Sequence, residues 1–167
     1  MKTLLLLRHA KSSWDDSSLR DFDRPLADRG KRDAPRMGRA LKDRGPVPDL
    51  IVSSPAARAK ATAEAAIKSG GFAASLQFDQ GIYDASTPDL LRIVRHLPDE
   101  SSCVLMVGHN PCFEELVYRL SGAHERMTTA ALAAIEFQVD RWEDVEDGQG
   151  KLLWFLTPKQ LGDKGED

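Results

Sequence analysis

Short apolar runs alternate with longer amphipathic stretches along this chain, and this order limits the folds it can adopt. Leu4–Leu7, Leu50–Val52 and Val104–Val107 are apolar at every position, which is typical of strands buried on both faces of a sheet. Apolar residues at helical spacing follow each run. The alternation predicts a layered α/β domain with a mostly parallel sheet.

The first expected helix contains apolar residues at helical spacing over 34–41 and ends at Gly45. Pro35 lies inside this pattern, where a proline would remove a helical hydrogen bond. The helix therefore either starts after Pro35 or is kinked there.

Three further helices are each preceded by a small polar residue and a proline. Ser54, Thr87 and Asn110 stand directly before a proline at the start of an amphipathic stretch. Small polar residues favour the N-cap position, and proline favours the first helical position. We therefore expect these three residues to cap the three helices, the first of which would span about 55–68.

The C-terminal part follows a different pattern. Leu76 and Phe78 indicate a short third strand. Further along, apolar residues alternate over 135–139, and a second apolar segment, 152–156, comes after a turn. The last two segments read as a hairpin with at least one antiparallel strand. The prediction is a three-layer αβα sandwich forming a single domain over 1–161, with a polar C-terminal tail at 162–167.

Composition excludes several functional classes. The net charge of −3 and the pI of about 5.8 give no reason to expect binding to nucleic acid or to a membrane. Every apolar run is far shorter than the roughly 20 residues of a transmembrane helix. Cys103 and Cys112 lack metal-ligand spacing and indicate no disulfide framework. We expect a cytoplasmic protein in which any anion site is a local concentration of positive charge.

Basic residues collect where three of the buried strands end. Arg8 and His9 follow the first strand, Arg58 lies shortly after the second, and His109 follows Gly108 after the third. Ligands of open α/β sheets bind beyond the carboxyl ends of the strands. These side chains are therefore expected to converge at one edge of the sheet.

The individual residues each allow a simpler interpretation. Arg58 would lie in a first helical turn, where it and the free N–H groups could bind phosphate, but it could equally be a surface arginine. His9 or His109 alone could be a hydrogen-bonded core histidine. Arg8 weakens that interpretation, because a buried arginine needs an anionic partner. His96 and His124 lack this context and are expected at the surface.

The motifs at these strand ends resemble those of the histidine phosphatase superfamily, which also includes phosphoglycerate mutases. They are Leu7-Arg8-His9-Ala10-Lys11-Ser12, then Ser53-Ser54-Pro55 with Arg58, Ala59, Thr62, Ala63 and Glu64, and finally Gly108-His109-Asn110. A narrower likeness to SixA-type phosphohistidine phosphatases rests on Arg8-His9-Ala10-Lys11-Ser12-Ser13-Trp14, Asp23-Arg24-Pro25-Leu26 and Gly30-Lys31-Arg32-Asp33-Ala34. The resemblance runs from Met1 to about Gln160 and implies a phosphoglycerate mutase-like fold.

This resemblance implies a mechanism. His9 would attack phosphorus and form a phosphohistidine that water then hydrolyses, without a metal or organic cofactor. Arg8, Arg58 and His109 would stabilise the charge on the phosphoryl oxygens, and Ser12 and Asn110 would contribute to substrate binding. The second ring nitrogen of His9 should donate to a backbone carbonyl that fixes the tautomer.

The sequence departs from the family pattern in two places. Asp15 stands where many mutase-like relatives have a phosphate-binding asparagine, so we do not assign it to the site. The carboxylic acid that protonates an alkoxide leaving group has no clear counterpart, although Asp84 or Asp79 could serve; each could equally be a turn-forming residue. Imidazole is a much weaker base than an alkoxide, so a site without a strong acid should prefer a P–N bond.

The leading hypothesis is therefore a phosphohistidine phosphatase acting on a histidine phosphocarrier or phosphotransfer domain, most simply as a monomer. The short chain predicts an open groove that admits a side chain of another protein. One alternative is a small-molecule phosphomonoesterase of the same fold that uses Asp84 or Asp79 as its acid. Another is a phosphate-binding module without turnover.

Overall fold

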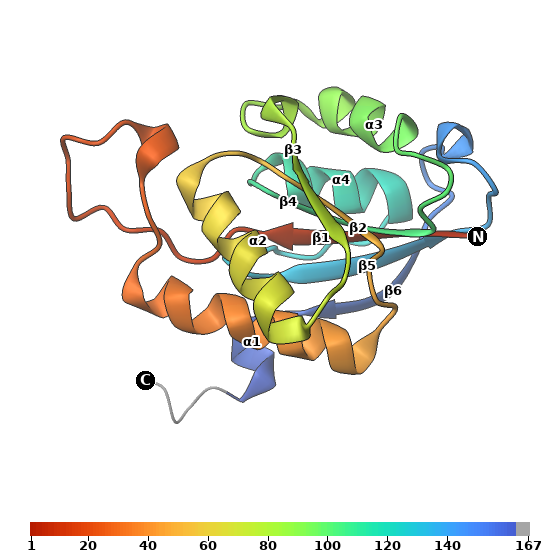
Figure 1. Ribbon diagram of the computed structural model, residues 1–167. Coiled ribbons are helices and arrows are strands. Elements are labelled where there is room, and N and C mark those ends of the chain that lie inside the picture. The colour runs from red at the N-terminus through yellow and green to blue at the C-terminus, as the bar shows by residue number, and fades with distance from the viewer. Residues whose placement is uncertain (163–167) are drawn as a thin grey trace.

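The computed structural model describes residues 1–162, so the predicted tail lies outside the described residues from position 163 onward. A single six-stranded sheet lies between two pairs of helices (Figure 1). This confirms the predicted αβα sandwich. The strands are β1 (Lys2–Arg8), β2 (Leu50–Ser53), β3 (Ser75–Phe78), β4 (Cys103–Gly108), β5 (Leu132–Phe137) and β6 (Lys151–Leu156).

The strand order across the sheet is β3-β2-β4-β1-β5-β6. β1, β2, β3 and β4 pair in parallel, whereas β5 is antiparallel to both β1 and β6. The predicted C-terminal hairpin is therefore present, and β5 is the strand that runs against the others. β2, β4 and β1 are neighbours, so their carboxyl ends lie side by side at one edge of the sheet.

Each face of the sheet is covered by two helices (Figure 1). α1 (Asp28–Arg44) and α2 (Ala57–Gly70) pack on one face, and α3 (Thr87–Arg95) and α4 (Cys112–Ser121) pack on the other. Successive side chains of β1 alternate between the two cores, with Leu4 facing α3 and α4 and Leu5 facing α1 and α2. Burying each leucine contributes roughly 1.5–3 kcal/mol relative to exposure, which fixes this strand centrally.

The starts of α1 and α3 differ from the sequence prediction. α1 begins at Asp28 and runs through Pro35, which excludes the later start, one of the two alternatives, and the missing N–H of Pro35 leaves one helical bond unmade. The N-cap of α3 is Ser86 rather than Thr87. Ser86 and Asp89 form a reciprocal capping box, which satisfies two free N–H groups and outcompetes Thr87.

The predicted caps of α2 and α4 are also wrong. Ala56 precedes α2, and Pro111 precedes α4. The hydroxyl of Ser54 accepts from the N–H of Ala56 before the helix begins. Asn110 Oδ1 accepts from the N–H of Glu114, inside the first turn of α4. Ser54 Oγ also bonds to His109 and the Asn110 amide to the Met127 carbonyl, contacts that the local sequence does not reveal.

Within residues 1–162, no helix has both the length and the apolar character needed to cross a bilayer. Cys103 and Cys112 are free, the first buried and the second partly buried.

Candidate active site

Three adjacent strand ends bring the basic residues together. His9 follows β1, Ser54 follows β2 and His109 follows β4. The His9 N–H donates to the Gly108 carbonyl at 2.9 Å, and the Ser54 N–H donates to the Val107 carbonyl at 2.9 Å. These backbone bonds continue the sheet by one residue, so the side chains that follow start from fixed positions.

A cavity of about 250 Å³ lies beyond this edge. The lining residues are Arg8, His9, Lys11, Ser12, Trp14, Arg24, Arg58, His109, Asn110 and Thr129. Six residues predicted to act in binding or catalysis therefore face one space: Arg8, His9, Ser12, Arg58, His109 and Asn110. The His9 and His109 ring centres are 5.2 Å apart, close enough for both rings to contact one tetrahedral phosphate.

His9 is held as a neutral ring with a defined tautomer. Its Nδ1 lies 2.8 Å from the Ala10 carbonyl oxygen. Because a carbonyl can only accept, Nδ1 carries the proton and Nε2 keeps its lone pair. Burial lowers the pKa of His9 to about 3; the hydrogen bond to Ala10 opposes this shift, and the nearby His109, Arg58 and Arg8 add to it. Near neutral pH, His9 can therefore act as a nucleophile through Nε2.

His109 is oriented by Ser54. Its Nε2 lies 2.8 Å from Ser54 Oγ, and Ser54 is fully buried. Burial and the nearby Arg58 lower the pKa of His109 to about 4. A bound phosphate dianion would offset both effects and favour a proton on His109.

Arg58 reaches the cavity from the first turn of α2 and is anchored by Asp21. Its guanidinium donates to the Asp21 carbonyl at 2.8 Å and to the Asp21 carboxylate at 3.0 Å. Tyr83 donates its hydroxyl to the same carboxylate at 2.8 Å, and Arg24 approaches it at 3.3 Å. Burial raises the pKa of Asp21, but hydrogen bonds from Tyr83 and Arg58 outweigh burial and lower that pKa to about 2.

Arg24 and Asp21 were missed as site residues in the sequence analysis. Arg24 belongs to a quoted motif, but nothing in its spacing places it at the sheet edge. The chain returns there because Ser12 and Leu26 form an antiparallel bridge, and the Ser13 N–H donates to the Pro25 carbonyl at 2.8 Å. The motif around Arg24 was the available signal, and only the folded chain shows its place.

The arginines and His109 contain buried polar atoms without partners. Within the described chain, Arg8 Nε, Arg58 Nε and His109 Nδ1 are buried and form no hydrogen bond. Burial lowers the pKa of Arg8, and the nearby Glu114 opposes that shift. Buried cations with unmade bonds are stabilised by an anion, so the arrangement is suited to binding a phosphoryl group.

The two carboxyl groups considered as proton donors lie elsewhere. Asp79 Oδ1 accepts from the Gly81 N–H at 2.8 Å and so holds a turn, as its simpler interpretation predicts. Asp84 is exposed, and neither residue lines the cavity that contains His9. Among residues 1–162, no carboxyl side chain lines this cavity. Asp15 is likewise exposed and outside it.

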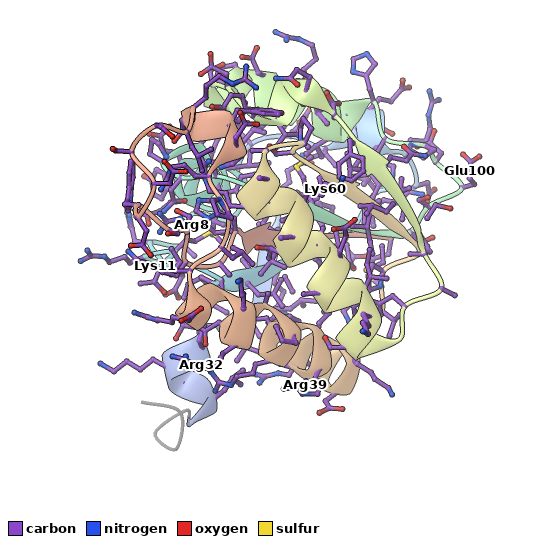
Figure 2. The ribbon with its side chains drawn as sticks, turned by 60° about the vertical axis from the view of Figure 1, so that its left-hand side comes forward. Arg8, Lys11, Arg32, Arg39, Lys60 and Glu100 are labelled. Carbon is purple, nitrogen blue, oxygen red and sulfur yellow. The ribbon has the colours of Figure 1, made fainter. Side chains whose placement is uncertain are left out.

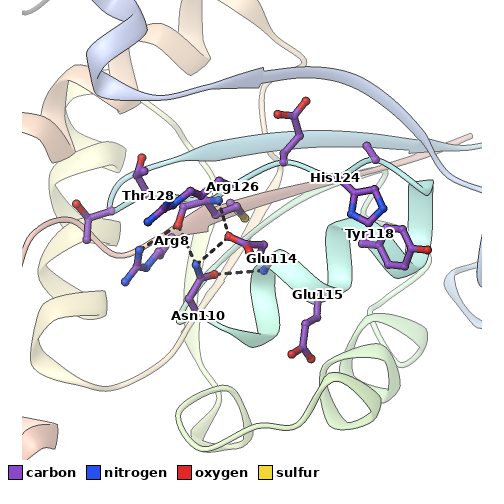
Figure 3. Close-up of a pocket in the computed structure, with 12 residues that line it drawn as sticks. Arg8, Asn110, Glu114, Glu115, Tyr118, His124, Arg126 and Thr128 are labelled. Carbon is purple, nitrogen blue, oxygen red and sulfur yellow. Dashed lines mark hydrogen bonds between the residues drawn. The ribbon is translucent and has the colours of Figure 1, made fainter.

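Arg8 and Glu114 both line a second, larger cavity of about 860 Å³ (Figure 3). Arg8 donates to the Met127 carbonyl at 3.0 Å, and Asn110 donates to the same oxygen at 2.8 Å. Glu114 in turn accepts from the Met127 N–H at 2.8 Å. Glu114 therefore fixes the carbonyl that orients Arg8 and Asn110, two residues that also line the 250 Å³ cavity containing His9, called the phosphate cavity below because phosphate is its expected ligand.

Replacing Glu114 with alanine is expected to lower kcat/KM for phosphate transfer by about ten- to hundredfold, because a small displacement of Arg8 weakens the phosphate contacts. The matched control is Glu115→Ala. Glu115 is the next residue of α4 and lines the same large cavity, but it accepts from Thr87 at 2.6 Å. Equal losses in the two variants would contradict a positioning role for Glu114.

His9, which is buried, and His109, which is partly buried, also predict how stability depends on pH. In the unfolded chain a histidine has a pKa of about 6.5, so the unfolded state binds protons first as the pH falls. Since the folded pKa values are about 3 for His9 and 4 for His109, the free energy of unfolding should fall below pH 6.5. The expected loss is roughly 2 kcal/mol per histidine at pH 5.

Urea unfolding at pH 7.5 and pH 5, in buffer without phosphate, measures this loss. The double variant His9→Asn/His109→Asn should lose most of the difference between the two pH values. A difference that persists unchanged in the double variant would assign the pH dependence to other groups.

Comparisons with known proteins agree with this geometry. The family model of the histidine phosphatase superfamily (branch 1) matches residues 4–90. An uncharacterized chloroplastic protein of Arabidopsis thaliana is 36% identical over 93% of this chain and 75% of its own length.

Two solved structures are similar over nearly the whole chain. A protein from Nakamurella multipartitia assigned as phosphohistidine phosphatase SixA has a TM-score of 0.82 and 29% identity, covering 94% of this chain and 96% of that chain. One from Agrobacterium tumefaciens with the same assignment has a TM-score of 0.81 and 29% identity, covering 94% and 98%. The sequence match and the shared fold lead to one assignment: this chain is a SixA-like member of the histidine phosphatase superfamily.

Proposed function

We propose that this phosphatase removes phosphoryl groups from phosphohistidine on another protein, through a covalent intermediate on His9. The SixA assignments of the two similar structures support this substrate class. The observation that carries the proposal is a cationic cavity that holds a neutral, correctly tautomeric histidine and, in the described chain, has no carboxyl side chain in its lining.

The proposed reaction has two in-line steps. His9 Nε2 attacks phosphorus, a new N–P bond forms, and the substrate P–N bond breaks. A substrate ring that is protonated on its other nitrogen leaves as neutral imidazole and needs no further proton. Water then attacks the phosphorus of phospho-His9, releasing phosphate, a proton and neutral His9.

The surrounding residues have distinct roles in both steps. Arg8, Arg58 and His109 stabilise charge on the phosphoryl oxygens, and Ser12 and Asn110 line the same cavity as binding residues. The Ala10 carbonyl accepts a hydrogen bond from the Nδ1–H of His9, at 2.8 Å in the unphosphorylated ring. That contact stabilises the positive charge that the ring gains when it is phosphorylated.

The position of Asp21 explains the preference for a P–N bond. An alkoxide leaving group needs a proton in the transition state, an effect worth about 10²–10⁴ in rate. Asp21 forms an ion pair with Arg58, which lines the cavity, but its pKa of about 2 keeps it ionised, so it cannot donate a proton near neutral pH. Imidazole does not depend on such an acid.

We further propose that the chain acts without a metal ion, as a monomer in the cytoplasm. Arg8 and Arg58 supply the positive charge that a metal would otherwise bring to the phosphoryl group. Unchanged turnover in EDTA and a monomeric mass by light scattering are expected.

Comparing leaving groups tests the proposed function. The protein should cleave a phosphohistidine peptide with kcat/KM at least about 100-fold above that for an alkyl phosphate, because only the alkoxide needs an acid. p-Nitrophenyl phosphate cannot decide the matter, since nitrophenolate is also a weak base. Faster cleavage of the alkyl phosphate would favour a phosphomonoesterase, and no turnover with either substrate would favour a binding module.

A further inference from the structure

Trp14 stands at the mouth of the phosphate cavity. Its side chain lines the cavity, yet the residue is 70% exposed, whereas His9 and Arg58 are 7% exposed at the base. Lys11 is the other exposed lining residue and points outward from the body (Figure 2). A large indole left in water beside a buried nucleophile has no role in packing the core.

An anchored cation holds the indole in place. The Arg24 guanidinium lies 3.4 Å from the centre of the Trp14 ring. Arg24 is itself buried, and it donates to the Asp21 carboxylate and to the Ser13 carbonyl, both at 3.3 Å. This cation–π contact occupies one side of the ring, and the exposure of Trp14 leaves much of the remaining surface free.

We propose that Trp14 forms a stacking platform for an aromatic leaving group, here the imidazole ring of the substrate phosphohistidine. The proposal rests on the function proposed above. Arg8, Arg58 and His109 would hold the phosphoryl group at the base of the cavity, so the leaving group must extend toward the mouth, where the indole lies. Two aromatic rings in contact are stabilised beyond their buried area.

This role separates substrates by their leaving group and not by the bond that breaks. Phosphoramidate contains the same P–N bond but releases ammonia, which has no ring. p-Nitrophenyl phosphate contains a P–O bond but releases an aromatic ring. A residue that acts on the phosphoryl group would affect these two substrates alike, whereas a stacking platform affects only the second.

The test compares Trp14→Ala, Trp14→Phe and the control Leu19→Ala on free phosphohistidine, p-nitrophenyl phosphate and phosphoramidate. Trp14→Ala should lower kcat/KM by about three- to tenfold on the two ring substrates, the size of one aromatic contact, and leave phosphoramidate unchanged. Trp14→Phe should retain most of the activity. Leu19 is also exposed, at 38%, and lies outside the cavity, so its replacement should change none of the rates.

Two results would overturn the platform. An equal loss on phosphoramidate would mean that Trp14 shapes the phosphate site. Unchanged rates on free phosphohistidine and p-nitrophenyl phosphate would mean that Trp14 does not contact the ring of the leaving group. The wild-type rates test the proposed function separately. If the wild-type protein cleaves only phosphoesters, that function fails. The effect of Trp14→Ala on p-nitrophenyl phosphate, compared with its effect on an alkyl phosphate, still tests the stacking.

Discussion

Replacing His9 with alanine is expected to lower kcat/KM on phosphohistidine by about 10⁴-fold or more, because the variant lacks the atom that bonds to phosphorus. The cavity and its arginines would remain, so phosphate or vanadate should still bind. Steady-state kinetics together with vanadate titration would show this separation of binding from turnover.

His96→Ala is the matched control for this variant. His96 is exposed, and its Nδ1 contacts the Arg92 carbonyl at 2.7 Å, on the last turn of α3. Its removal should leave the rate unchanged. If His9→Ala retained more than a few per cent of wild-type activity, another group would have to be the nucleophile.

Replacing Arg58 with alanine is expected to lower kcat by about 10²–10³-fold, the usual loss when a preorganised donor is removed from a developing anion. Arg58 is buried and pairs with Asp21 beside the cavity, so its removal also leaves the Asp21 carboxylate without that ion pair. Arg58→Lys should recover little, since one ammonium cannot contact both the phosphate and Asp21 with the planar geometry of a guanidinium.

Arg92→Ala provides the comparison. Arg92 is 65% exposed and pairs with Asp89 at 3.0 Å on the surface of α3, where an ion pair contributes little. It should retain the wild-type rate. Similar losses in the Arg58 and Arg92 variants would mean that overall charge, and not the local geometry at the sheet edge, governs turnover.

The sheet and the convergence at its edge could be predicted from the sequence because both follow from local patterns. A run such as Leu4–Leu7 is apolar at every position, and the structure buries its alternate residues in two separate cores. A residue that directly follows such a strand, as His9 does, must lie at the carboxyl edge. Parallel pairing of β1 with β4 then places His109 beside it.

The rest of the site depends on contacts between distant segments. Ser54 was predicted as a helix cap, but its hydroxyl bonds to His109, 55 residues away. Arg24 and Trp14 reach the cavity because the segment after β1 folds back on itself through the Ser12 and Leu26 bridge. The sequence around one residue of such a contact does not indicate which distant residue it will meet.

The proton-donor question shows the same limit. The sequence offers Asp79 and Asp84 near the expected position, and the spacing alone does not distinguish an acid from a turn residue. The Asp79 bond to the Gly81 N–H and the exposed position of Asp84 assign them to the loop before α3. The carboxylate that forms an ion pair with the lining residue Arg58 is instead Asp21, from a segment that the spacing did not indicate.

Rapid-quench labelling of the wild-type protein tests the central claim most directly. The protein is mixed with a phosphohistidine substrate, quenched at alkaline pH to preserve the P–N bond, and mapped by mass spectrometry. The account predicts an acid-labile phosphoryl group on His9 that forms and decays at the rate of turnover. A phosphoryl group on His109, or turnover with no covalent intermediate on any residue, would contradict it.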